Sequence, residues 1–271
     1  MKKFTKMWAI AACALFAGTA AVNAEDYTWK FVTAGDATTY AIRSDGSLWS
    51  WGWNEKGQGG NGVSERTATP TLADGNRVWK KAVGGKAYGF FLAEDGSLWA
   101  AGTHEGGVQG TNDGIDHKVL TRIGTDNDWA DMACSRFWGY SGFAIKTNGT
   151  LWAWGKNSAG QLGIGNTQAQ TAPVQVGADM DWKQVAAGCS SVLALKTDGS
   201  LWGWGFNMYS ELFGHEGKQL SPVRLGSETD WEQVVVIDFR AYAVKKDGTL
   251  WAWGDNANNL SLIHISEPTR P

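Results

Sequence analysis

Asp198-Gly199-Ser200-Leu201-Trp202 is one of five copies of a short motif, and these copies decide the fold. The other copies are Asp45-Gly46-Ser47-Leu48-Trp49, Asp95-Gly96-Ser97-Leu98-Trp99, Asn148-Gly149-Thr150-Leu151-Trp152 and Asp247-Gly248-Thr249-Leu250-Trp251. The closing Trp recurs at intervals of 50, 53, 50 and 49 residues. A repeat of this length predicts a propeller or a solenoid.

Each motif also predicts a β-hairpin. Apolar runs flank the Asp-Gly pair, and a two-residue type I′ turn there would require positive φ at both central residues. In the strand that follows, Trp202 and Trp204 share one face, while Leu201 and Gly203 share the other. Neither face carries a charge, which suits a sheet packed between two neighbouring sheets.

Tryptophan marks the units at two further positions. One set opens each unit and consists of Trp29, Trp79, Trp129, Trp182 and Trp231. The other set lies two residues after the Leu-Trp pair and consists of Trp51, Trp154, Trp204 and Trp253; Ala101 takes this position in the second unit. With the closing set they account for 14 of the 17 Trp, so most of the tryptophan is expected to be scaffold. Pro173–Val176 and Pro222–Leu225 predict a fourth strand per unit, as in a propeller blade.

The third unit carries a family resemblance. Its run Trp154-Gly155-Lys156-Asn157-Ser158-Ala159-Gly160-Gln161-Leu162-Gly163, with the Asp-Gly hairpins, resembles the regulator of chromosome condensation repeat. The resemblance covers roughly residues 29–259 and implies an all-β fold, a seven-bladed β-propeller of which about four and a half blades are present. Kelch repeats need a Gly-Gly doublet in each blade, and only Gly84-Gly85 fits.

The two ends of the chain read differently from the repeats. Residues 1–24 have the basic start, apolar stretch and small-residue cleavage site of a signal peptide. Residues 25–259 form the incomplete propeller domain. Residues 260–271 resemble a translated sequencing adaptor, so we expect a non-native tail and a gene that continues beyond residue 259. Because open blade ends expose apolar faces, the chain as written is expected to aggregate or to be partly molten.

Export and composition limit the function. The resemblance is to a secreted bacterial type, located in the periplasm, at the cell surface or outside the cell. Without the two end segments, 20 basic and 26 acidic residues remain, which argues against nucleic-acid binding. Chromatin binding and nucleotide exchange, known in the eukaryotic branch, are therefore not expected. No segment after the signal peptide is long and apolar enough to span a membrane.

No catalytic or metal-binding pattern is present. His104, His117 and His215 fall in predicted loops of different units without a partner motif, and the recurring Asp residues are explained by turn geometry. We therefore expect neither enzymatic activity nor a cofactor. Cys134 and Cys189 lie in the opening strands of adjacent units, where they would form either a disulfide, permitted by export, or two buried thiols.

The loop after each opening strand varies between units, and function is expected there. The loop Ser135–Tyr140 is longer and aromatic, and such residues dominate protein interfaces. We predict a scaffold that binds a protein through aromatic loops on one propeller face; the alternatives are a carbohydrate-binding propeller, an accessory module of a larger surface protein or enzyme, or aromatics that pack between blades. The candidate binding residues are Trp53, Tyr88, Arg136, Phe137, Trp138, Tyr140, Phe206, Tyr209, Phe239 and Arg240.

Overall fold

The structure, a computed structural model, describes residues 28–213, 215 and 217–255. The expected signal peptide and C-terminal tail lie outside these residues. The described chain is β throughout, apart from the short 3₁₀ helix η1 (Glu105–Gly107). The strands are β1 (Trp29–Ala34), β2 (Thr38–Arg43), β3 (Leu48–Gly52), β4 (Thr67–Asp74), β5 (Trp79–Gly84), β6 (Tyr88–Ala93), β7 (Leu98–Gly102), β8 (His117–Arg122), β9 (Trp129–Cys134), β10 (Ser141–Lys146), β11 (Leu151–Gly155), β12 (Gln170–Gln175), β13 (Trp182–Ala187), β14 (Ser191–Lys196), β15 (Leu201–Phe206), β16 (Lys218–Arg224), β17 (Trp231–Ile237), β18 (Arg240–Lys245) and β19 (Leu250–Gly254).

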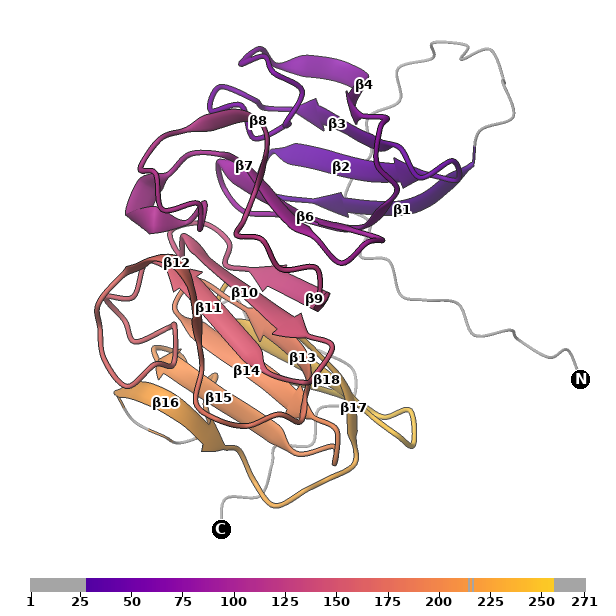
Figure 1. The fold of residues 1–271 in the computed structure, drawn as a ribbon. Helices are drawn as coiled ribbons and strands as arrows, with labels where there is room; N and C mark the ends of the chain where they lie inside the picture. The colour runs from indigo at the N-terminus through magenta and orange to yellow at the C-terminus, as the bar shows by residue number, and fades with distance from the viewer. Residues whose placement is uncertain (1–27, 214, 216, 256–271) are drawn as a thin grey trace, which may run out of the picture.

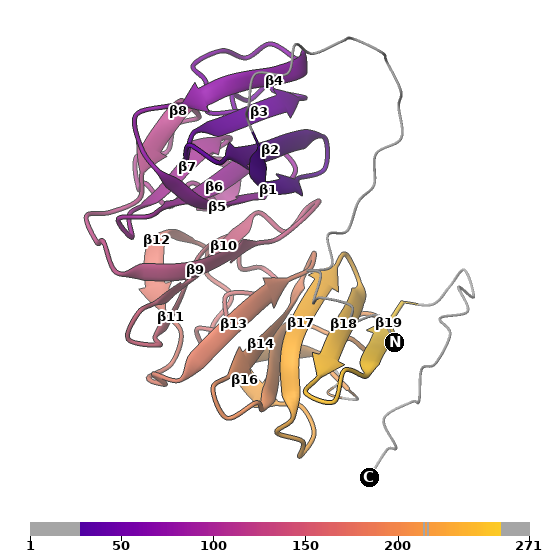
Figure 2. The same cartoon turned by 90° about the vertical axis from the view of Figure 1, so that its right-hand side faces the viewer.

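These strands form five antiparallel sheets that follow one another around an arc (Figures 1 and 2). We call them blades 1 to 5: β1–β4, β5–β8, β9–β12, β13–β16 and β17–β19. Blade 1, in indigo, and blade 5, in yellow, stand at the two ends of the arc. The prediction of an all-β propeller architecture is confirmed, as is the fourth strand at both Pro positions, which are β12 and β16. Among the described residues, no helix is long and apolar enough to cross a membrane.

The first strand of each blade is the innermost one. The five inner strands line a central channel that holds a cavity of about 190 Å³. Hydrogen bonds join neighbouring inner strands: the Gln184 amide donates to the carbonyl of Val234 at 2.9 Å and accepts the Val234 N–H at 3.0 Å. Lys81 of β5 likewise donates to the Met132 carbonyl of β9 at 2.9 Å. The side chain two residues after the opening Trp, Gln184 or Lys81, therefore fixes the spacing between its blade and the next one.

The recurring motif forms a hydrogen-bonded turn in every blade. In blade 4, Gly199 has φ of +84°, but Asp198 is not in the left-handed region, so the expected two-residue type I′ turn is wrong. The bonds from Lys196 N–H to the Ser200 carbonyl and from Gly199 N–H to the Lys196 carbonyl close a three-residue loop, a type I turn ending in a left-handed glycine. A single positive φ is thus enough, and glycine supplies it.

The acidic residue of this turn anchors a tryptophan. Asp198 Oδ1 accepts the Ser200 N–H at 2.8 Å and the Ser200 hydroxyl at 2.6 Å, and Ser200 Oγ accepts the Trp202 indole N–H at 2.9 Å. The same relay occurs in the other four blades, with Asn148 as the acceptor in blade 3. The Ser200 hydroxyl, followed by its N–H, holds the pKa of Asp198 below its ordinary value. The interpretation of the recurring Asp as a turn residue is confirmed.

Blades are joined by apolar packing and by a second tryptophan bond. Between blades 3 and 4, Phe143 and Leu151 pack in one cluster with Trp182 and Trp204, and each of these side chains is at most 3% exposed. The Trp204 indole N–H then crosses the junction to the Gln161 carbonyl at 2.8 Å. Aromatic burial of this kind supplies much of the stability of a core. The Trp that opens each unit, such as Trp182, and the Trp two residues after the Leu-Trp pair, such as Trp204, are therefore scaffold, as the repeat pattern predicted.

Candidate functional site

Two faces of the propeller differ in kind. Because successive strands are antiparallel, the Asp-Gly turns all lie on one face, and the connections between first and second and between third and fourth strands all lie on the other. We call the second face the loop face. All ten predicted binding residues belong to connections or strand ends on the loop face, so the structure brings them to one side of the molecule.

The aromatic loop of blade 3 exposes two aromatic side chains on the loop face. Phe137 is 44% exposed and Trp138 is 65% exposed. The loop is bound to other blades, because Arg136 Nη2 donates to the Ala34 carbonyl of blade 1 at 3.0 Å and Lys86 Nζ of blade 2 lies 3.4 Å from the centre of the Trp138 ring. Three blades therefore hold one loop in place.

The backbone of this loop is strained in a way that fixes its shape. Phe137 and Tyr140 have φ of +48° and +45°, in the left-handed region that non-glycine residues rarely occupy. A Cβ at Gly139 would lie 2.2 Å from the Cβ of Ser135, so no larger residue fits between them. The Gly139 N–H bonds to the Arg136 carbonyl at 3.0 Å. The loop is built as a tight, closed turn that aims two aromatic side chains outward.

Carboxylates from the two end blades meet around Arg136. Asp36 of blade 1 is exposed, yet the surrounding loops remove enough water to raise its pKa, against the lowering effects of the Phe137 N–H, Arg136 and Lys86. Burial likewise raises the pKa of Asp238 in blade 5, which Arg136 lowers. Asp238 has φ of +55°. Sequence reasoning singled out Arg136 but not these acidic partners, because their proximity depends on how the blades curve around the channel.

Two predicted binding residues are not on the surface. Tyr88 is fully buried and Tyr140 is 4% exposed, so the expectation that they contact a partner is wrong. The Tyr88 hydroxyl donates to the Ser135 carbonyl of the next blade at 2.6 Å, and its ring lies 5.9 Å from that of Tyr140. Burial raises the pKa of Tyr140 to about 12. Both tyrosines support the aromatic loop from below.

The other predicted residues lie at the edges of the loop face. Tyr209, 42% exposed, packs against the half-buried Phe239 with ring centres 5.0 Å apart. Arg240 has a structural role, because its Nε donates to the Asp255 carbonyl at 2.9 Å and its Nη2 to the Asp255 carboxylate at 3.2 Å. The remaining two, Trp53 and Phe206, are half-buried at the ends of β3 and β15. Tyr209 and Phe239 thus extend the aromatic surface, while Arg240 does not.

Cys134 and Cys189 are free thiols in the structure, so the disulfide alternative is not realised there. Cys134 is buried and Cys189 half-buried. Burial raises the pKa of Cys134 to about 12 and that of Cys189 to about 11. Thiols with such pKa values are protonated and poorly nucleophilic at neutral pH.

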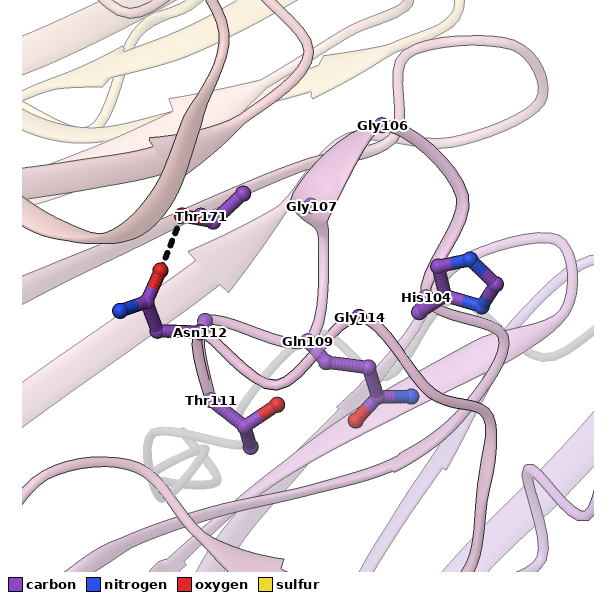
Figure 3. Close-up of a pocket in the computed structure, with 9 residues that line it drawn as sticks. His104, Gly106, Gly107, Gln109, Thr111, Asn112, Gly114 and Thr171 are labelled. Carbon is purple, nitrogen blue, oxygen red and sulfur yellow. Dashed lines mark hydrogen bonds between the residues drawn. The ribbon is translucent and has the colours of Figure 1, made fainter.

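A small pocket of about 110 Å³ lies on the loop face between blades 2 and 3 (Figure 3). Glycines line much of it, and Asn112 bonds to Thr171 across its edge at 2.5 Å. Its one titratable side chain, His104, is paired with Asp116 at 2.6 Å. Within the described ranges, His, Cys, Asp and Glu side chains nowhere gather in threes as a metal site requires.

Comparison with known proteins agrees with this architecture. Two family models, both described as the regulator of chromosome condensation (RCC1) repeat, match the chain: one at residues 45–92 and 148–195, the other at 29–58. The ultraviolet-B receptor UVR8 of Arabidopsis thaliana is 29% identical over 163 residues, and human protein RCC2 is 27% identical over 150 residues. These alignments take in 59% and 54% of this chain, but 37% and 19% of the relatives.

Solved structures show the same fold. Human WBSCR16 superposes with a TM-score of 0.74 at 18% identity, over 85% of this chain and 63% of that one. Yeast RCC1 (Prp20), bound to Kap60, gives 0.73 at 20% identity, over 85% and 57%. This chain thus spans less than two thirds of each relative. The matched segments identify regulator of chromosome condensation (RCC1) repeats in this chain, and these neighbours show that it has an RCC1-like β-propeller fold.

Proposed function

We propose that this protein is an exported binding scaffold that recognises another protein through the aromatic loop of blade 3. The observation that carries the proposal is the exposure of Phe137 and Trp138 on a loop held by three blades. Exposed aromatic residues provide most of the binding energy in typical protein interfaces. A loop that is already ordered loses little conformational entropy on binding.

The surroundings of the loop favour a protein over a sugar. Lys86 covers one side of the Trp138 ring, which removes the open aromatic platform on which a sugar ring would stack. The corresponding loops of blades 1 and 4 carry no aromatic side chain, so the site is a single protrusion rather than a repeated set of pockets. Yeast RCC1 is bound to Kap60 in one solved structure, and its binding to Gsp1p and histones has been studied. Propellers of this fold thus bind proteins, and we extend that role to this chain.

Export and the absence of catalysis belong to the same proposal. The signal-peptide pattern of residues 1–24 supports export. His104 and His117 each pair with one aspartate, at 2.6 and 2.8 Å, which supports a structural role for both. Binding, not chemistry, is the function that these side chains favour.

The test is affinity capture with purified protein from the exported proteins of the producing cells. Phe137→Ala/Trp138→Ala should lose a captured protein, with at least a tenfold weaker affinity once that protein is purified. Met180→Ala is the matched control, because Met180 is an exposed apolar residue (60%) outside the loop face. Capture that the double variant retains, or that the control also loses, would contradict the proposal. Binding to an oligosaccharide array through Trp138 would favour the carbohydrate alternative instead.

A further inference from the structure

The connection between the third and fourth strands of blade 4 differs from the same connection in blades 1 to 3. We call its first part, Phe206–Phe213, the blade 4 loop. It holds Met208 and Tyr209, which are 50% and 42% exposed. Their positions are exposed in blade 1 too, where Glu55 and Lys56 stand beside the complete blade 2, so this exposure does not depend on where the chain ends. Of blades 1 to 4, only blade 4 places two large apolar side chains there.

The backbone of the blade 4 loop is strained at two positions. Ser210 has φ of +66° and Phe213 has φ of +45°, both in the left-handed region. In blades 1 to 3 glycine occupies these positions, as Gly57, Gly107 and Gly160 for the first and Gly60, Gly110 and Gly163 for the second. Left-handed backbone at other residues is disfavoured, and it concentrates at functional sites. Blade 4 thus departs from the unstrained glycine turn of its neighbours at the same loop that exposes Met208 and Tyr209.

The blade 4 loop is continuous with the aromatic loop of blade 3. The Trp138 N–H donates to the Cys189 thiol, and the Ser190 carbonyl accepts the Phe206 N–H at 2.9 Å. Only two residues of blade 4 therefore separate the two loops. We call the whole surface the uncharged belt, because none of its residues is ionised at neutral pH: Phe137, Trp138, Cys189, Ser190, Phe206, Asn207, Met208 and Tyr209.

Charged groups lie beside the uncharged belt rather than within it. Arg136 and Lys86 adjoin its blade 3 end, where they bond to the Ala34 carbonyl and cover one side of the Trp138 ring. Glu211 is fully buried beneath the blade 4 loop, and Asp238 is half-buried beside Cys189. A charged group of a partner would lose water over the belt without gaining a counter-ion, which is costly. The belt therefore favours an apolar contact along its length.

We infer that the uncharged belt is one interface and that the protein partner covers it with an elongated apolar segment of no net charge, an inference that rests on the proposed function. Phe137 and Trp138 anchor one end of the segment, and Tyr209 anchors the other. Met208 adds a flexible thioether that adapts to the shape of an apolar partner. The Tyr209 ring is held for this role by Phe239, with ring centres 5.0 Å apart.

The probe for the test is a random peptide library displayed on phage and selected against the full 271-residue chain. Enriched peptides should be rich in apolar residues and carry no net charge. The affinity of synthetic copies should change less than about threefold between about 0.05 and 0.5 M NaCl, because no ion pair is made. Enrichment of strongly charged peptides whose binding falls steeply with salt would overturn the inference, and so would a selection that enriches no apolar peptide.

Matched variants test whether both ends of the belt take part. Met208→Ser/Tyr209→Ala gives blade 4 the two residues of blade 3, and it should weaken binding of the synthetic peptides about tenfold. Phe137→Ala/Trp138→Ala should have an effect of the same size. Met180→Ala, an exposed control outside the loop face, should have none. All of these side chains are exposed, so the variants should fold, as circular dichroism would check.

Methionine oxidation locates the bound peptide without any substitution. Hydrogen peroxide transfers one oxygen atom to the thioether of an exposed methionine, which becomes a sulfoxide while the peroxide becomes water. A bound peptide should slow this reaction at Met208 at least about threefold and leave the rate at Met180, 60% exposed, unchanged. Equal protection of both methionines, or of neither, would overturn the inference.

The two double variants also separate the uncharged belt from the aromatic loop alone. Peptides that need Phe137 and Trp138 but not Met208 and Tyr209 would overturn the extended interface, while the proposed function of the aromatic loop would stand. Peptides that need only Met208 and Tyr209, or neither pair, would overturn both.

Discussion

Replacing Glu211 by Gln should stabilise this protein at neutral pH. The Glu211 side chain is fully buried; its Oε2 accepts the Tyr209 N–H at 2.7 Å, while its Oε1 has no hydrogen-bond partner. Gln58 and Gln161 occupy the same place in blades 1 and 3, where their side-chain oxygens accept backbone N–H groups at 3.1 and 2.9 Å. Glutamine thus keeps the shape and the first bond, and it removes a buried charge.

The magnitude follows from the charge on the unpartnered oxygen, because the equivalent Gln58 Nε2 in blade 1 is also buried without a partner and only the charge is removed. Leaving a buried acceptor without a donor costs about 1–3 kcal/mol, and more if it is charged. The Ser191 hydroxyl lies close but outside hydrogen-bonding geometry, and it offsets part of this cost. We therefore expect a gain near the lower end, about 1 kcal/mol. In urea this gain moves the unfolding midpoint upward by roughly 0.3–0.5 M.

The effect depends on pH in a defined direction. Burial raises the pKa of Glu211, against the lowering effect of the Tyr209 N–H, so the folded protein binds this proton more tightly than the unfolded chain does. The stability of the wild type therefore falls as pH rises from the unfolded pKa, about 4.3, through the raised folded pKa. Glutamine has no such dependence, and the gain should be present at pH 7 and nearly absent at pH 4.

Urea unfolding of both proteins at pH 4 and pH 7 checks this reasoning. Glu232→Gln is the control, because Glu232 is exposed and the same charge is removed without burial. Equal midpoints for wild type and Glu211→Gln at pH 7 would refute the argument. A gain of the same size at pH 4 would refute it too, since the benefit would then not come from the carboxylate.

Three further outcomes test the scaffold. Trp204→Phe should lower the free energy of unfolding by about 2–4 kcal/mol in denaturant titrations, because it leaves a void and an unpaired Gln161 carbonyl. Ser200→Ala should raise the pKa of the Asp198 carboxyl toward its ordinary value in an NMR titration. The stability that Asp198 contributes above its unfolded pKa, and that is lost in acid, then becomes smaller. An unchanged pKa would show that the Ser200 relay to Trp202 does not lower the pKa of Asp198. The buried Cys134 thiol, with its pKa of about 12, should react with a disulfide reagent at pH 8 only after unfolding. Fast reaction of Cys134 itself in the native protein, as distinct from the half-buried Cys189, would contradict its burial.

The repeat itself was predictable because its chemistry is local. Spacing of the Trp and the Asp-Gly pairs predicted five repeat units, amounting to about four and a half blades, with their hairpins and the scaffold role of the indoles. The turn type was not predicted correctly, since the three-residue loop depends on the bond between Lys196 N–H and the Ser200 carbonyl. A single glycine is compatible with both turns, and only the backbone geometry distinguishes them.

The candidate site was predictable only in part, because its contacts cross blades. Arg136 and Ala34 are 102 residues apart, and their bond exists because the inner strands converge at the channel. The same convergence buries Tyr88, which the sequence could not separate from the exposed Trp138. Exposure on this face is set by neighbours in space, and the one-dimensional pattern shows only neighbours within a blade.

Departures from the repeat are compensated within the structure. Ala101 takes the place of the junction Trp in blade 2, so the loop carbonyl of Gln58 loses its expected donor; the Tyr40 hydroxyl of blade 1 supplies it instead at 3.0 Å. Within blade 2, the buried carbonyl of Thr103 likewise has a side-chain donor, because the Gln109 amide donates to it at 3.0 Å. The second unit has the weaker motif, and side chains elsewhere satisfy the groups that the motif would have satisfied.

The division between the two faces explains why the aromatic loop can serve binding without weakening the fold. On the turn face each blade uses its polar groups in the relay from Asp to Ser to Trp. In blades 3 to 5 a lysine also lies over two indoles, as Lys196 lies 4.9 and 4.5 Å from Trp182 and Trp202. The blade 3 loop takes no part in these contacts, and the side chains of Phe137 and Trp138 point out of the core. Loss of both side chains should therefore remove partner binding while the unfolding midpoint stays within error of wild type, which separates a binding role from a structural one.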